Sequence, residues 1–436
     1  MRLELNYIRS QLGSLAGTIF ANWLASVFYL LFPILYDIRV NGLHNYTASP
    51  STLVTINHKR DLDIIIAAPI LHLRKTLFKD KLRLNFIARD DLFDPSFLSA
   101  HFLIPGPIGR IIHKVNIATI MHALRAYPIS HLVQKRIGPL LRDVNRVEGD
   151  LKLREIIKQD ELKEFTKPLN KPYNSDLSEL SVSDFLGYEY RELHQRFSDV
   201  GILHEDLSRK VKKYLLNKIK KQLQVFARIL DDGGSCLLAP EGHLSPDGRF
   251  WPVKSGLNRL LSMTESEVRI LPVNTTYDFM TRGRMRIFVS IGKEILRPKK
   301  LRKVELERLV QRSIISLGPV TMGQLGSEYL LWSLKAHREV INKDELASEL
   351  KSKVRELSSS GLRLDSRLVA KSSFDRRLHD FIGYCRSKHI LEESTPGIFI
   401  IKRDKILSGT GFRHWENSVQ YSSNELKSLL ELSRVF

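Results

Sequence analysis

The longest apolar stretch of the sequence lies close to its beginning. No charged residue occurs between Arg9 and Asp37, and the 22 residues from Leu15 to Tyr36 are interrupted only by small polar residues and Asn22. About 20 such residues span the hydrocarbon core of a bilayer as a helix. The run predicts a membrane-associated helix that either crosses the bilayer or lies half-buried in one leaflet. A buried core helix is an alternative, and a cleaved signal peptide fits less well because no A-x-A-like cleavage site follows.

Beyond this run, short apolar segments alternate with amphipathic ones. The short segments predict a buried strand followed by a turn over residues 51–58, and strands over residues 84–88, 235–239, 270–274 and 285–291. The amphipathic segments predict helices over residues 61–73, 108–125 and 207–230. Strands that alternate with helices predict an α/β fold, in which a mixed, mostly parallel sheet is flanked by helices.

Two stretches do not fit a compact α/β unit. Residues 137–208 are polar, charged and rich in helix-forming residues, and they predict a helical insertion. The C-terminal stretch is helical in pattern, with a strand-like segment at 398–403. We therefore expect an N-terminal membrane-associated helical segment over 1–45, an α/β domain over 46–296 that contains the insertion, and a mainly helical C-terminal domain over 297–436.

Charge changes this picture by predicting a partner. The chain has 68 Lys and Arg residues against 48 Asp and Glu residues, which gives a formal net charge of +20. Such an excess predicts an anionic partner, either nucleic acid or an anionic membrane. The predicted helix over 207–230 is strongly basic opposite an apolar stripe, which favours an ordinary packed helix slightly over a membrane-surface helix. Only two cysteines occur, Cys236 and Cys385, which excludes a disulfide framework and an all-cysteine zinc site.

The first segment with candidate catalytic residues lies at a predicted junction between a strand and a helix. It begins at Asn57, and its His58 and Asp63 are five residues apart. With His58 just before the helix and Asp63 in its first turns, we expect the carboxylate to reach the imidazole. A base that is oriented by a carboxylate can remove a proton from an alcohol. Taken alone the spacing is weak, because a surface histidine followed by an aspartate at a helix N-terminus looks the same.

The second segment follows the predicted strand over 235–239. Gly242 and Gly248 permit tight turns of its backbone. Arg249 and Lys254 supply positive charge that can hold a phosphate through charge-assisted hydrogen bonds. An ordinary loop between a strand and a helix is the alternative interpretation.

Together the two segments resemble the glycerolipid acyltransferase family, whose members acylate glycerol-3-phosphate or lysophosphatidic acid. The family signature N-H-x-x-x-x-D is matched by Asn57, His58 and Asp63. The second signature, F-P-E-G-T-R-S, appears as APEGHLS over 239–245 and is followed by Lys-Ser-Gly over 254–256.

The resemblance extends over about residues 50–295. A later apolar block of the family, which contains a proline, resembles ILPV over 270–273. More faintly, residues 317–334 look like the tail of longer members that use glycerol-3-phosphate. The block that lies between the two signatures in the family is hard to place, because RAYPISH over 125–131 lacks its terminal arginine.

One departure concerns the acceptor. The Thr-Arg pair of the family's second signature is His243-Leu244 here, and that arginine usually contacts the phosphate of the acceptor. Arg249, Lys254 and Arg259 are the candidates to replace it. The identity of the acceptor is therefore open.

The resemblance implies an enzyme of phospholipid biosynthesis at the cytoplasmic face of a membrane. His58 would act as the catalytic base and Asp63 would orient it, with no covalent acyl-enzyme. The implied substrate-binding residues are Asn57, Arg60, Glu241, Gly242, Ser245, Arg249 and Lys254. Neither a metal nor a bound cofactor is expected, and the co-substrate would be acyl-coenzyme A or an acyl-acyl carrier protein. The expected partners are this donor, a phosphate-bearing glycerol acceptor and anionic membrane lipid, but not nucleic acid.

Two other functions compete with this hypothesis. The net charge supports a nucleic-acid-binding protein, and part of the C-terminal region could form a winged helix, but the sequence has no ribonucleoprotein-type aromatic motif and no zinc-finger spacing. The altered His243-Leu244 pair supports a catalytically silent, acyltransferase-like membrane scaffold. The intact His58 and Asp63 favour the enzyme.

Overall fold

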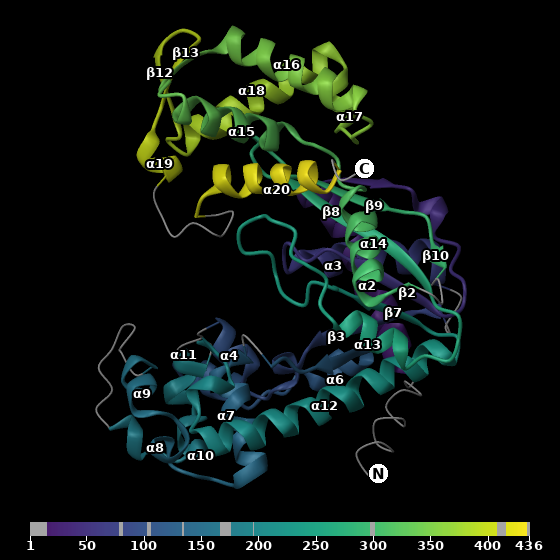
Figure 1. Ribbon diagram of the computed structural model, residues 1–436, viewed down its shortest axis with the longest axis vertical. Coiled ribbons are helices and arrows are strands. Elements are labelled where there is room, and N and C mark those ends of the chain that lie inside the picture. Colours follow the sequence, from purple (N-terminus) through teal and green to yellow (C-terminus); the bar gives the residue numbers. More distant parts are fainter. Residues whose placement is uncertain are drawn as a thin grey trace. The chain divides into compact units, whose positions relative to one another are not determined.

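The computed structural model describes residues 15–77, 82–102, 106–132, 135–165, 176–194, 196–296, 301–407 and 416–433 (Figure 1). The chain forms two compact units. Unit 1 comprises residues 1–21 and 85–228, and unit 2 comprises residues 22–84 and 229–436. This division cuts the chain at other places than the predicted domain limits, one of which, residue 297, lies outside the described residues.

Unit 2 is built on a mixed sheet with the strand order β1-β9-β8-β2-β7. The strands are β1 (Asp37–Asn41), β2 (Thr52–Ile56), β7 (Ser235–Leu238), β8 (Arg269–Asp278), β9 (Arg286–Ile291) and β10 (Ile295–Leu296). β1 pairs in parallel with β9, and β2 in parallel with β7 and β8. β9 and β10 pair antiparallel with β8. The prediction of an α/β fold with a mixed, mostly parallel sheet is confirmed.

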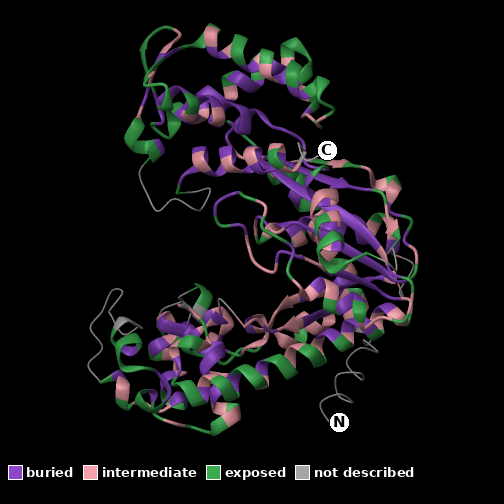
Figure 2. Ribbon diagram, in the orientation of Figure 1, coloured by how far each residue is buried: buried purple, intermediate pink, exposed green. Residues whose placement is uncertain are grey.

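The centre of this sheet explains why a strand forms where the sequence predicted one. β2 has the sequence TLVTI, and all five of its residues are buried. Such β-branched and apolar side chains suit a strand that is covered on both faces. Leu53 lies beside Cys236 of β7 and Ile270 of β8. Figure 2 shows the strands of this sheet as largely buried. The residues that directly follow Ile56 therefore lie at the carboxyl end of β2, at the edge of the sheet.

Helices flank the sheet of unit 2. They are α2 (Leu15–Leu35), which begins in unit 1, α3 (Leu62–Leu71), α13 (Gly256–Ser262) and α14 (Lys303–Ile315), and a π-helical turn, η2 (His72–Thr76), continues α3. α3 confirms the helix that was predicted over 61–73. One apolar helix near the N-terminus, α2, was likewise predicted.

The remainder of unit 2 is a mainly helical C-terminal module. Its elements are α15 (Met322–Lys335), β11 (Val340–Asn342), α16 (Lys343–Ser359), α17 (Ser366–Val369), α18 (Lys371–Ser387), β12 (Leu391–Thr395), β13 (Ile398–Ile401), α19 (Arg403–Leu407) and α20 (Ser418–Ser433). The three strands form an antiparallel sheet with the order β11-β13-β12. Apart from the four-residue helix α17, the elements from α15 to β13 follow the order of a winged helix.

Unit 1 contains short strands and many helices. The strands are β3 (Leu84–Arg89), β4 (Ala126–Ile129), β5 (Lys135–Arg136) and β6 (Phe197–Ser198). The helices are α4 (Phe97–Phe102), α5 (Gly106–His113), α6 (Ala118–Ala123), α7 (Ile137–Glu148), α8 (Leu153–Ile156), α9 (Gln159–Phe165), α10 (Val182–Phe185), α11 (Arg191–His194) and α12 (Glu205–Asp231), the last of which ends in unit 2. The predicted insertion has a hydrophobic core of its own, which extends from Ile137 to Leu215.

The single helix that was predicted over 108–125 is wrong. The structure has two helices, α5 and α6, in its place. The side chain of Asn116 accepts a hydrogen bond from the backbone N–H of Ala118 at 2.8 Å. An asparagine that satisfies a free N–H group at a helix start favours a new helix there over continuation of the old one.

Candidate active site

The predicted His58–Asp63 pair forms at the carboxyl edge of the sheet. β2 ends at Ile56, and α3 begins at Leu62, so Asp63 lies in the first turn of α3. The Nδ1 atom of His58 lies 3.4 Å from Oδ2 of Asp63. The His58 side chain is partly exposed, whereas Asp63 is fully buried. The arrangement leaves the Nε2 side of the imidazole for a substrate, because no described residue forms a hydrogen bond with that atom.

Asp63 is held in place by four further hydrogen-bond donors. Its Oδ2 accepts the backbone N–H groups of Lys59 at 2.6 Å and Arg60 at 2.8 Å. Its Oδ1 accepts the hydroxyl groups of Thr275 at 2.7 Å and Tyr277 at 2.5 Å. Hydrogen bonds of this kind stabilise the charged form of a buried carboxylate. Asp63 is therefore positioned to orient His58 and to stabilise an imidazolium.

Thr275 and Tyr277 of β8 were missed by the sequence analysis. They stand two residues apart and directly follow the apolar block ILPVN, so they share one face of the strand. That alternation of polar residues after a buried run was the available signal. Burial and the charge of Asp63 hold the pKa of the Tyr277 hydroxyl well above its ordinary value, so Tyr277 remains a hydrogen-bond donor.

Asn57 is fully buried, and it connects the turn over residues 57–61, which we call the His58 turn, to β8. Its side-chain amide donates to the carbonyl of Thr275 at 2.9 Å, and its side-chain carbonyl accepts the Thr275 N–H at 2.7 Å. The amide thus continues the pairing of β2 with β8 past the last residue of β2. The structure gives Asn57 a structural role, and its predicted contact with substrate stays a prediction.

Glu241 connects the His58 turn to the second signature. One carboxylate oxygen accepts the backbone N–H of His58 at 3.2 Å, and the other accepts that of Trp251 at 3.1 Å. The side chain is buried. Ser245 reinforces this connection, because its N–H donates to the carbonyl of His58 at 2.8 Å. Its hydroxyl donates to the Arg249 carbonyl at 2.6 Å, so both residues position the loop.

Gly242 forms the turn at the start of this loop. Its φ is +72°, and a Cβ at this position would lie 3.2 Å from Cδ of Lys254. Its N–H donates to the carbonyl of Ala239 at 3.1 Å, and in this conformation it does not serve an oxyanion. Gly242 therefore contributes the turn over which the Lys254 side chain passes.

The basic side chains around the site differ in their exposure and in the groups that they contact. The Arg249 side chain is largely exposed, with its Nε 3.5 Å from a carboxylate oxygen of Asp247. Lys254 is exposed, and the partial burial of its ammonium lowers its pKa. Arg259 lies on α13 and is exposed. His243, in the place of the family threonine, packs edge-on against Trp251, and burial lowers its pKa.

Arg60 is a predicted binding residue whose backbone N–H donates to Asp63, the partner of His58. Its guanidinium carbon lies 4.6 Å from the ring centre of Tyr277 and 5.0 Å from that of Phe279. Nη1 contacts the sulfur of Met285 at 3.3 Å. Nε and Nη2 are buried, and neither has a hydrogen-bond partner among the described residues. These two N–H groups form one edge of the guanidinium, which matches two oxygens of a phosphate or carboxylate.

The C-terminal helix α20 contacts both signatures. The ammonium of Lys59 forms a buried ion pair with Glu425 and lies 4.5 Å from the ring centre of Phe250. Asn424 donates to the carbonyl of Asp247 at 3.0 Å. A Cβ at Gly248 would lie 2.2 Å from the carbonyl oxygen of Tyr421, so only glycine permits this close approach. The sequence analysis did not connect α20 with the site.

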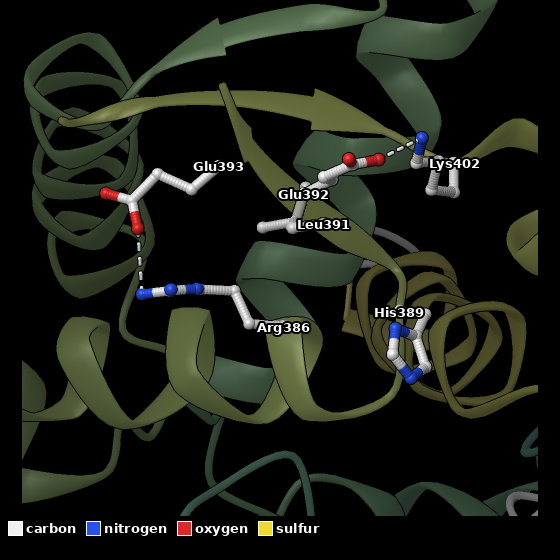
Figure 3. A pocket seen from close by; sticks show the side chains of 6 residues that line it. All are labelled: Arg386, His389, Leu391, Glu392, Glu393 and Lys402. Atoms are coloured by element: carbon white, nitrogen blue, oxygen red, sulfur yellow. Dashed lines mark ion pairs between the residues drawn. The ribbon is translucent and has the colours of Figure 1, made fainter. Parts of the chain in front are cut away.

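A separate pocket in the C-terminal module offers no comparable chemistry. It has a volume of 290 Å³ and lies between α18 and the β12–β13 hairpin (Figure 3). Its charged side chains pair with one another, Arg386 with Glu393 at 2.9 Å and Lys402 with Glu392. Among the described residues, no group of three or more His, Cys, Asp or Glu side chains is arranged to hold a metal ion. The absence of a metal from the reaction stays a prediction.

Glu241 gives a testable dependence of stability on pH. Burial raises the pKa of its carboxyl from 4.5 to about 7, although the two backbone N–H groups oppose the shift. The folded state therefore holds this proton more tightly than the unfolded state. The free energy of unfolding should fall by about 3 kcal/mol between pH 4.5 and pH 7 through this group alone.

Glu241→Gln has no carboxyl to titrate, so the difference in unfolding free energy between wild type and this variant should change by that amount over the window. Urea unfolding at several pH values measures the difference. Parallel stability curves for the two proteins would contradict the prediction.

The comparisons with known proteins do not assign the chain to a family, so the functional interpretation rests on its residues. A scan against models of protein families gave no match to the chain. A search of curated proteins likewise gave none.

Proposed function

We propose that the protein is an acyltransferase at the cytoplasmic face of a membrane, which moves a fatty acyl group from an acyl thioester to a hydroxyl of a glycerol phosphate or lysophospholipid. The observation that carries the proposal is the partly exposed His58 beside the buried, fully hydrogen-bonded Asp63. The pair lies at the carboxyl end of a strand in a mostly parallel sheet, where α/β proteins commonly bind ligands. Its residues match the first signature of the glycerolipid acyltransferases.

In the proposed reaction His58 is the general base. Its Nε2 removes the proton from the acceptor hydroxyl as that oxygen forms a bond with the thioester carbonyl carbon. Asp63 stabilises the resulting imidazolium. The tetrahedral intermediate then breaks its C–S bond, and the thiol leaves with the proton from His58. No covalent acyl-enzyme is needed, and the thiols of Cys236 and Cys385 are both buried, which raises their pKa values.

We assign recognition of the acceptor phosphate to Arg60, with Lys254 as a further cation. Arg60 belongs to the same turn as His58, and the Nε–Nη2 edge of its guanidinium is unmatched within the described residues. A phosphate held by that edge would lie beside the catalytic pair. This assignment replaces the arginine that the second signature lacks at Leu244.

The contacts of α2 favour a helix that lies in one leaflet. Residues 17–35 are long and apolar enough to cross a membrane, and only 11% of the most apolar window is buried. Yet the Asn22 amide pairs with His72 at 2.8 Å, Arg74 donates to the Tyr29 hydroxyl at 2.8 Å, and Arg284 donates to the Pro33 carbonyl at 2.9 Å. A spanning helix would carry these polar partners into the hydrocarbon core, where they are costly.

The other face of α2 supplies the apolar surface for the leaflet. Trp23, Leu30 and Ile34 are all exposed, and their spacing of seven and four residues places them on one face. Phe32, nine residues after Trp23, falls on the opposite face and is buried. A helix that packs one face on its own protein and presents a tryptophan and aliphatic side chains on the other suits the membrane interface.

The contacts of the C-terminal module weaken the nucleic-acid hypothesis. In a helix-turn-helix protein the second helix of the motif enters the major groove. Here the corresponding helix, α18, packs on β8 and the residues that follow it: Arg377 forms a buried ion pair with Asp278 of β8 and donates to the Thr281 hydroxyl at 2.7 Å. A Cβ at Gly383 of α18 would lie 2.5 Å from Nε of Arg282. This face of α18 is therefore occupied within the protein.

An acylation screen tests the proposed function. The full chain in lipid would be offered acyl-coenzyme A or acyl-acyl carrier protein together with glycerol-3-phosphate, lysophosphatidic acid, lysophosphatidylcholine or glycerol. Mass spectrometry should detect an acylated product with a phosphate-bearing acceptor, and Arg60→Gln should reduce the preference for phosphate over unphosphorylated glycerol. Absence of product from every pair would support the silent scaffold. DNA affinity at moderate salt without acyl transfer would support the nucleic-acid alternative.

A further inference from the structure

Exposed apolar side chains are concentrated in one short part of unit 1. Five lie between residues 102 and 120, with exposed fractions of 63% for Phe102, 65% for Ile108, 68% for Ile111, 41% for Val115 and 47% for Ile120. We call these five residues the apolar segment. In the rest of the described part of residues 85–228, Leu216 is the one further large hydrophobic residue that is exposed, and its exposed fraction of 38% is lower than that of any of the five. Such a concentration marks an interaction surface rather than scattered surface residues.

The helix α5 presents the centre of the apolar segment to solvent. Ile108 and Ile111 are three residues apart and therefore share a face of the helix. Gly109 is the one buried residue of α5, and the helix packs against α4. α5 thus rests on its glycine side while its two isoleucines point outward. The arrangement resembles that of α2, in which one face packs on the protein and the other is apolar and exposed.

The part of the sequence that contains the apolar segment is basic. From Pro95 to Arg142 the sequence contains no Asp or Glu, although it contains six Lys and Arg residues. Two of these cations, Arg110 and Lys114, are exposed and alternate with the isoleucines and Val115. An exposed apolar surface whose isoleucines alternate with cations is complementary to an anionic leaflet, which offers hydrocarbon beneath a layer of phosphates.

We propose that the apolar segment is a second membrane contact, carried by unit 1 and separate from α2. In this contact Ile108 and Ile111 enter the boundary between headgroups and acyl chains of an anionic leaflet. Arg110 and Lys114 bind the lipid phosphates at the same depth. The contact does not depend on the acyltransferase reaction, so it stands or fails independently of the proposed function.

A fluorescent label on the full chain tests this contact. Ile111→Cys would be labelled with an environment-sensitive dye, and Leu216→Cys is the matched control from an exposed site outside the segment. The two native cysteines are buried, which limits background labelling. With vesicles of equal parts phosphatidylcholine and phosphatidylglycerol, emission at position 111 should shift to the blue and be quenched by nitroxide lipids. Position 216 should not respond, and pure phosphatidylcholine should give a much weaker response at position 111.

A pair of charge substitutions tests the same contact by affinity. Ile108→Glu combined with Ile111→Glu should reduce the vesicle partition coefficient roughly tenfold or more, because two aliphatic side chains no longer enter the interface. Leu216→Glu should leave it unchanged, and the melting temperatures should agree because all three sites are exposed. A water-exposed label at position 111 on vesicle-bound protein would overturn the proposal. So would equal partitioning of the charge variants, or a blue shift that grows with protein concentration without vesicles, which would identify a second copy as the occupant.

Discussion

Replacing His58 with alanine should lower the turnover of acyl transfer by about 10²- to 10⁴-fold, the range that general bases contribute. The substitution removes the partly exposed imidazole that Asp63 orients. The four other hydrogen bonds to Asp63 come from the backbone and from Thr275 and Tyr277, so they persist in the variant. We therefore expect the loss in turnover with little change in melting temperature.

His243 provides the matched control. It is a half-buried histidine in the second signature, and its ring pairs with a backbone carbonyl at 3.1 Å and packs on Trp251. His243→Ala should retain turnover within a few-fold of wild type, as expected for a residue that does not contact the reacting atoms. Retention of more than a tenth of the wild-type turnover by His58→Ala would remove His58 from the role of base. A similar large loss in both variants would point to disturbance of the loop instead.

Replacing Glu425 with alanine should destabilise the fold by about 3–5 kcal/mol, the usual cost of leaving one partner of a buried ion pair uncompensated. Both side chains of the Lys59–Glu425 pair are nearly inaccessible, at 3% and 2% exposure. Without Glu425, the Lys59 ammonium keeps the face of the Phe250 ring and the electrostatic attraction of Glu241. Because Lys59 is adjacent to His58 and its N–H holds Asp63, turnover should fall as well.

Two variants test whether the ion pair causes this effect. Lys59→Met combined with Glu425→Leu replaces both charges by apolar groups of similar size, and it should recover most of the lost stability. Glu431→Ala removes an exposed glutamate from the same helix and should change the free energy of unfolding by less than about 0.5 kcal/mol. Urea unfolding measures all three. A Glu425→Ala variant as stable as Glu431→Ala would show that the pair does not hold α20 to the site.

The local pattern of apolar and polar residues was sufficient to predict the turn that contains His58. The buried run TLVTI, the polar residues after it and the apolar positions of α3 predicted a strand, a turn and a helix that bring His58 to Asp63. The period of a strand and the period of a helix determine these faces without reference to the rest of the chain. The same reasoning failed at residues 108–125, where the hydrogen bond from Ala118 N–H to the Asn116 side chain marks the start of a second helix within an otherwise continuous amphipathic pattern.

The groups that support the turn could not be predicted in this way. Thr275 and Tyr277 reach Asp63 because β8 is the parallel neighbour of β2, with Ile56 beside Val273. Strand order is a property of the whole sheet, and spacing along the chain does not specify it. Glu425 is further still from any local signal, because a glutamate on an amphipathic helix looks the same whether it meets water or a buried lysine.

The Lys59–Glu425 ion pair joins residues that are 366 positions apart in the chain. At the usual speed of translation, the glutamate leaves the ribosome about 20 to 70 s after the lysine. During that interval α2 and the turn over residues 57–61 have already been synthesised, whereas α20, which carries Glu425, has not. Until α20 has emerged from the ribosome, Lys59 therefore lacks the carboxylate with which it pairs in the folded protein.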